Sequence, residues 1–141
     1  MPFGYHGRIL RVDLTSSTVS IEELAEDICR KYMGGSALNL YYLLNEMSAG
    51  ADPLGEDNIL VLSSSAVTGA PVSGLSRMTV SAKSPLTGAI GDSQCGGTWP
   101  VKLKFSGFDA VIIKGKAPAP VYLRIYDGKA ELKDASTLWG K

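Results

Sequence analysis

Residues 77–100 read RMTVSAKSPLTGAIGDSQCGGTWP and carry the pattern of two strands joined by a turn and followed by a helix. Polar and apolar side chains alternate over 77–82, which is the period of a half-buried strand. Proline and glycine in 84–88 predict a tight turn, and 89–92 predict the next strand. Thr98 stands where a helix cap is expected. Two strands joined by so short a turn pair in the antiparallel direction.

Two further helices are expected before this stretch. Apolar residues four apart predict a helix over 24–32, which Gly34 and Gly35 end. Apolar residues at helical spacing then predict a second helix, with Ser36 in position to cap it. The third helix, which begins at Thr98, is expected to stop near Gly107.

Short alternating or apolar runs predict the strands of the fold. We expect seven of them, over 8–14, 19–21, 59–62, 77–82, 89–92, 109–114 and 120–126. A hairpin turn at 127–128 then leads on to Ala130 and Leu132. Seven strands and three helices, with hairpins dominating, predict the α+β class with a mostly antiparallel β-sheet.

Length, charge and hydropathy restrict the class of protein. A chain of 141 residues suggests one domain that buries roughly two-thirds of its unfolded surface. Its net charge is zero, so no overall field attracts nucleic acid or anionic lipid. The sequence contains neither a signal peptide nor an apolar run of membrane-spanning length. We therefore expect a cytoplasmic protein that binds neither nucleic acid nor membrane.

The cysteines and the single histidine offer no metal or hydrolytic centre. Cys29 and Cys95 are far apart, without a C-x-x-C pair, so this segment alone cannot build a zinc site or an iron–sulfur cluster. One interpretation is a disulfide between them. The simpler interpretation, in a reduced compartment, is that both are buried thiols. His6, in the extended start of the chain, is expected to have a surface or cap role, and we assign no catalytic residue.

Glycine is the unusual feature of the composition. Glycine accounts for 16 of the 141 residues, about 11%, whereas average usage is about 7%. Two connections rich in glycine and serine, 63–76 and 93–97, flank a strand that begins with Arg77, and a helix starts directly after the second. Bare backbone, a helix N-terminus and a guanidinium suit a flat anion or a phosphate. Chain reversal is the alternative role of such turns, and neither G-x-x-x-x-G-K-[ST] nor G-x-G-x-x-G is present.

Seven motifs occur in order along nearly the whole chain. They are GRILRVDL at 7–14, KYMGG at 31–35, TGAP at 68–71, KSPLTG at 83–88, GG at 96–97, LKFSGFDA at 103–110 and DASTLWGK at 134–141. Together they resemble the N-terminal domain of the tungsten-dependent aldehyde:ferredoxin oxidoreductase family. The last motif looks like a helix start at the chain's end, so we expect residues 1–141 to be a pterin-cofactor-binding domain truncated from a larger enzyme.

The resemblance implies an oxidoreductase that converts aldehydes to carboxylic acids. Its cofactor would be a bis-pterin carrying tungsten or molybdenum, with Mg²⁺ bridging the pterin phosphates. Electrons would pass through a [4Fe-4S] cluster, bound by cysteines of the missing domains, to ferredoxin. The enzyme would be a homo-oligomer, and the isolated domain would be inactive. The alternatives are a non-catalytic pterin-binding or assembly module, or a related tungsten enzyme that reduces aromatic thioesters.

The resemblance also implies which residues contact the cofactor. Arg77 matches a contact to the pterin or its phosphate, and Gln94 and Gly96 fall on contact positions of the loop formed by Ser93, Gln94, Cys95, Gly96 and Gly97. Asp92, beside this loop, is a candidate to face a pterin nitrogen. The sequence departs from the family at Gln94, where asparagine is common, and at residues 36–37, where Arg-Gly is usual and Ser-Ala is found.

Overall fold

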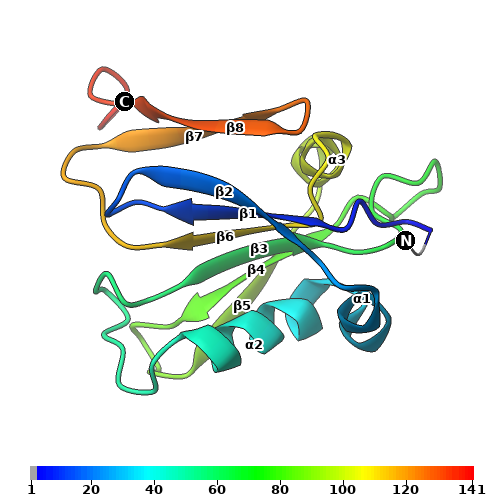
Figure 1. Ribbon diagram of the computed structural model, residues 1–141, viewed down its shortest axis with the longest axis horizontal. Helices are drawn as coiled ribbons and strands as arrows, with labels where there is room; N and C mark the ends of the chain where they lie inside the picture. The colour runs from blue at the N-terminus through cyan, green and yellow to red at the C-terminus, as the bar shows by residue number, and fades with distance from the viewer. Residues whose placement is uncertain (1–2) are drawn as a thin grey trace.

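One six-stranded sheet organises the protein, with helices on one face and a helix and a hairpin on the other (Figure 1). The computed structural model describes residues 3–141. Its elements are β1 (Arg8–Asp13), β2 (Thr18–Glu23), α1 (Glu26–Tyr32), α2 (Gly35–Glu46), β3 (Leu60–Ser64), β4 (Met78–Lys83), β5 (Ile90–Cys95), α3 (Thr98–Phe105), β6 (Ala110–Lys114), β7 (Val121–Tyr126) and β8 (Lys129–Asp134).

The large sheet has the strand order β2-β1-β6-β3-β4-β5, and β7 pairs with β8 in a separate hairpin. Among the strands that the structure describes, the β1–β6 pair is parallel and the other pairs are antiparallel. This arrangement confirms the predicted α+β class with a mostly antiparallel sheet. Because β5 is the last strand in this order, one of its edges has no strand beside it within residues 3–141.

Alternation along the strands divides the interior into two cores. Ile9 packs with Leu38 and Leu43 of α2 on one face of the sheet. Leu10, the next residue, packs on the other face with Leu103 of α3 and the inner side of the β7–β8 hairpin. Successive strand residues point to opposite faces, so one strand supplies both cores. The sheet is therefore the middle layer of three.

A buried ion pair holds the N-terminal segment to α3 and β6. Lys104 Nζ lies 2.5 Å from Asp109 Oδ1, and their side chains are only 6% and 2% exposed. The same carboxylate accepts hydrogen bonds from the backbone N–H groups of His6 at 3.2 Å and Gly7 at 2.6 Å. Asp109 therefore fixes the position at which the chain enters β1.

Several sequence predictions differ from the structure. The segment after the 127–128 turn is an eighth strand, β8, because its backbone pairs in antiparallel register with β7. The backbone of 134–141 forms turns and no helix. The expected cap residues do not cap: α2 and α3 begin after Gly34 and Gly97, and neither has a side-chain cap. None of the helices within 3–141 is long and apolar enough to cross a bilayer.

Candidate functional site

The two glycine-rich connections meet at the free end of the β4–β5 pair. Met78 begins β4 and stands opposite Cys95, the last residue of β5, so Arg77 and Gly96 are neighbours just beyond the paired region. A Cβ built on Gly96 would lie 3.8 Å from both Cδ and Nε of Arg77 and 3.5 Å from the Ser76 carbonyl oxygen. We call Arg77, Gln94, Gly96 and Gly97 the ledge.

Gly97 gives the ledge its sharp turn into α3. Its φ of 82° is in the left-handed region, where a residue with a Cβ is strained, and no heavy atom lies within 4 Å of the position that a Cβ would take. The helix that follows has no side-chain cap, so the N–H groups of its first turn are not satisfied by a side chain. Bare backbone and the positive end of a helix therefore lie together at this point.

The predicted contact residues in 93–95 belong to the strand and not to a loop. They continue β5 in register with β4, because Ser93 and Gln94 pair with Val80 and Thr79. Alternation then separates their side chains: Gln94 lies on the α2 face with Thr79, while Ser93 and Cys95 lie on the opposite face. Only Gln94, of the three, shares a face with α2.

Both cysteines are free thiols, so no disulfide joins Cys29 to Cys95. Cys29 is buried as predicted, and burial raises the pKa of its thiol. Cys95 is exposed, so the expectation of two buried thiols is wrong for this residue. The reason is the position of β5 at the edge of the sheet, which leaves its outer residues uncovered.

The sequence reasoning did not place a second glycine pair close to the ledge. Gly34 forms an isolated bridge with Ser65 at the start of the 65–77 connection, and Gly35 begins α2. A Cβ on Gly35 would lie 3.4 Å from Oγ1 of Thr79, the residue opposite Gln94. The signal in the sequence was the Gly-Gly pair itself, which we interpreted only as the end of the preceding helix.

The 65–77 connection is closed by one buried threonine. Thr68 Oγ1 accepts a hydrogen bond from the Ser65 N–H at 2.9 Å and donates one to the Arg77 carbonyl at 2.8 Å. These bonds join the start of the connection to its end. The backbone beside Arg77 is therefore held in place, although the connection is rich in glycine and serine.

Arg77 carries the available positive charge of the ledge. Its side chain is exposed and makes no ion pair with any other residue of the described chain. A guanidinium in this state presents donors that a phosphate or a carboxylate can accept bidentately.

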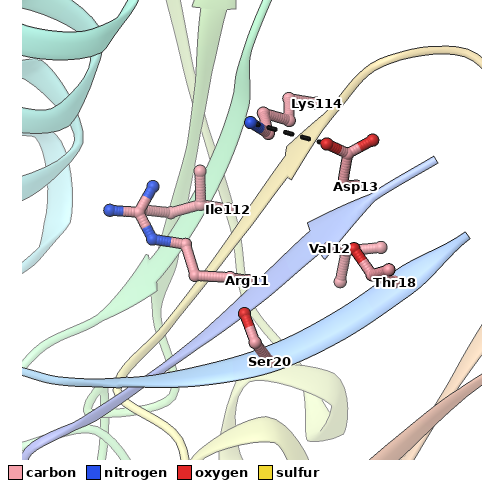
Figure 2. A pocket seen from close by; sticks show the side chains of 7 residues that line it. All are labelled: Arg11, Val12, Asp13, Thr18, Ser20, Ile112 and Lys114. Atoms are coloured by element: carbon pink, nitrogen blue, oxygen red, sulfur yellow. Dashed lines mark ion pairs between the residues drawn. The ribbon is translucent and has the colours of Figure 1, made fainter. Parts of the chain in front are cut away.

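A pocket at the far end of β1 also contains cations, but there they are paired with carboxylates (Figure 2). Arg11 there donates to Glu46 at 2.5 Å and to Glu22 at 2.6 Å, and Lys114 lies 3.5 Å from Asp13. Because these carboxylates already neutralise both cations, this pocket is a poor site for an anion. The ledge is the better candidate.

Within residues 3–141, no three His, Cys, Asp or Glu side chains are grouped so that they could hold a metal ion. His6 is exposed, beside the buried Asp109 that its backbone contacts. The ledge brings together a cation, an amide and bare backbone. In chemical terms it can bind and orient an anionic ligand, and it presents no nucleophile paired with a general base.

The fold and the ledge together define an α+β domain that offers bare backbone and an exposed cation at the end of the β4–β5 pair. Residues 9–141 match the model of the aldehyde ferredoxin oxidoreductase N-terminal domain. The chain belongs to the aldehyde ferredoxin oxidoreductase family.

Named relatives agree with this membership. The chain is 45% identical over 141 residues to the tungsten-containing aldehyde ferredoxin oxidoreductase of Pyrococcus abyssi, a match that covers 99% of this chain and 23% of that protein. It is 38% identical to the WOR-like subunit of an aliphatic sulfonate oxidoreductase of Pyrococcus furiosus, covering 98% of this chain and 22% of the subunit. The chain thus spans less than a quarter of the length of these relatives.

A solved structure has the same fold. The active site complex BamBC of benzoyl coenzyme A reductase superimposes with a TM-score of 0.96 at 34% sequence identity. The superposition covers 100% of this chain and 22% of the BamBC chain. The family resemblance inferred from the motifs is therefore confirmed.

Proposed function

We propose that this chain is the N-terminal domain that carries the tungsten bis-pterin cofactor of an oxidoreductase converting aldehydes to carboxylic acids. The observation that carries the proposal is the exposed guanidinium of Arg77, which has no ion-pair partner within residues 3–141, beside the bare backbone of Gly96. Family membership and the tungsten-containing relatives support the choice of cofactor. The remaining domains of the enzyme would bind the [4Fe-4S] cluster and pass electrons to ferredoxin.

The donor set of the ledge fits a pterin. A pterin is flat, has hydrogen-bonding edges and carries a phosphate, so it needs closely approaching backbone together with a cation. Arg77 would neutralise the phosphate, Gln94 would bind through its amide, and Gly96 with Gly97 would let the backbone approach. Open space next to Gly97 agrees with this assignment, since a Cβ there would meet no atom of the chain.

Each partner contributes a separate part of the function. When bound, the tungsten bis-pterin would supply the two-electron redox chemistry, while the protein supplies binding, orientation and electrostatics. Arg77 would hold negative charge near the N-terminus of α3, and the backbone of Gly96 and Gly97 would hold the ligand against that helix end. A Mg²⁺ bound with the cofactor would add positive charge beside the phosphates.

A second reaction is favoured by one observation. The superimposed BamBC complex is named as part of benzoyl coenzyme A reductase, and benzoyl-CoA is an aromatic thioester. A tungsten enzyme that reduces such a thioester is therefore the alternative to aldehyde oxidation. A module that carries or assembles pterin without catalysis is the remaining alternative.

The test is Arg77→Ala in the complete enzyme that contains this domain. Removing one exposed guanidinium should leave the fold intact and lower the tungsten content per protomer by about tenfold, the effect of one charge-assisted hydrogen bond. Elemental analysis measures tungsten, and circular dichroism checks folding. Arg124→Ala, on the β7–β8 hairpin, is the matched control and should retain full tungsten content. Unchanged tungsten in the Arg77 variant would overturn the proposal.

A further inference from the structure

Asp92 ties the edge strand β5 to the first turn of α2. Its Oδ2 accepts a hydrogen bond from the Ser36 hydroxyl at 2.7 Å, and its Oδ1 accepts one from Ser81 at 2.5 Å. Ser36 belongs to α2, and Ser81 stands opposite Asp92 on β4. Both carboxylate oxygens are thus engaged within the chain, which argues against the direct contact to a pterin nitrogen suggested by the sequence.

Asn39 extends this contact into the core. It is fully buried, and its Nδ2 lies 2.8 Å from Ser81 Oγ and 3.2 Å from the carbonyl oxygens of Val61 and Thr79. Because Ser81 accepts from Asn39, its own proton is directed to Asp92. We call the four side chains of Ser36, Asn39, Ser81 and Asp92 the Asp92 clamp.

The clamp acts on β5, the strand that carries Gln94 and leads directly into Gly96. Gln94 follows Asp92 by two positions, so both side chains lie on the same face of β5, about 7 Å apart along the strand. Within residues 3–141, strand pairing restrains β5 on one side only. A rotation of β5 about its axis would move Gln94 away from α2, and the Asp92–Ser36 bond opposes that rotation.

We propose that Asp92 is a positioning residue: the Asp92 clamp fixes β5 against α2 and thereby sets where Gln94 and Gly96 meet the cofactor. This inference rests on the proposed function of the ledge. Ser36 is the α2 partner of Asp92 in this clamp. Its hydroxyl donates to Asp92 and does not cap the helix as the sequence predicted.

The experiment compares three variants of the complete enzyme. Asp92→Ala removes the clamp, and Ser36→Ala removes only its bond to α2. Asp92→Asn has the same size, keeps one acceptor for the Ser81 hydroxyl, and replaces the other with a donor that the Ser36 hydroxyl can accept. We expect the two alanine variants to lower tungsten per protomer at least threefold, and Asp92→Asn to restore about the wild-type content. Hydrogen exchange at the amides of 93–96 should quicken in the alanine variants alone.

Ser36→Ala separates positioning from direct contact. If Asp92 touched the cofactor itself, Ser36→Ala would keep its tungsten while Asp92→Ala lost it, and the inference would be overturned. Glu131→Ala, which breaks an exposed ion pair on the β7–β8 hairpin, is the control expected to change neither readout. Should Asp92→Ala give no soluble enzyme, Ser36→Ala and its exchange rates decide the question alone.

The failure of each proposal gives a different pattern. If Arg77→Ala lowers tungsten but both alanine variants of the clamp retain it, the positioning role is wrong and the ledge stands. If Arg77→Ala retains tungsten as well, the ledge does not bind the cofactor, and the positioning role is overturned with it.

Discussion

Gly34→Ala tests how closely α2 must approach β3. Gly34 has a φ of 101°, where an alanine is strained by about 1–3 kcal/mol. Its Cβ would also overlap the carbonyl oxygen of Ser64 and lie 3.0 Å from Cα of Ser65. The Ser64 backbone is held by a 3.0 Å hydrogen bond from its N–H to the Asp109 carbonyl, so it cannot yield freely. Overpacking of this kind costs about another 1–3 kcal/mol.

Gly74→Ala is the matched control for this prediction. Gly74 has a φ of 86°, but no heavy atom lies within 4 Å of its Cβ position, so only the backbone strain remains. Urea unfolding of the chain, followed by circular dichroism, should give a loss of about 2–6 kcal/mol for Gly34→Ala. The loss for Gly74→Ala should be smaller by about 1–3 kcal/mol. Equal losses would show that the close approach of Gly34 to β3 does not matter.

Two other predictions concern charged groups away from the ledge. Lys104→Met leaves the buried carboxylate of Asp109 without its ammonium partner and should lower the free energy of unfolding by about 3–5 kcal/mol. Lys102→Met, an exposed position on the same helix, should change it by less than about 0.5 kcal/mol, and similar losses would contradict the assignment. Asp13 accepts a hydrogen bond from the Ser16 N–H at 3.1 Å, and this bond, with the charge of Lys114, lowers the pKa of its carboxyl. Its contribution is therefore fully present above the unfolded value of about 3.9 and is lost as the pH falls through the lower folded value. An NMR titration that placed the pKa of Asp13 at or above 3.9 would refute this.

Local pattern was sufficient for most of the elements. The alternation in 8–14 and 77–82 predicted β1 and β4, because the two faces of each strand lie in different surroundings on the two sides of the sheet. It did not predict the parallel pairing of β1 with β6, since their residues are a hundred positions apart and only the three-dimensional sheet brings them together. The strand after 127–128 was missed because β8 is short of large apolar residues.

The site was only partly predictable for a different reason. The glycines and Arg77 pointed to the ledge, since glycine-rich connections and an arginine beside them are recognisable in a sequence. The clamp was not, because Ser36 and Asp92 are ordinary surface residue types whose pairing depends on how α2 packs over β3 and β4, next to β5. A serine at the start of a helix predicts a cap by local rules, and a tertiary partner took its hydroxyl instead.

The position of β5 explains how one strand can be both restrained and accessible. β4 pairs with it on one side, Asp92 ties it to α2, and its other edge has no neighbouring strand within residues 3–141. An edge strand left open in this way presents backbone N–H and C=O groups to whatever lies beside it. A flat ligand with hydrogen-bonding edges would use those groups together with Gln94 and Arg77. A ligand bound here would therefore slow hydrogen exchange along β5 more than along β2, the opposite edge of the same sheet, and equal protection of both edges would contradict the ledge as its site.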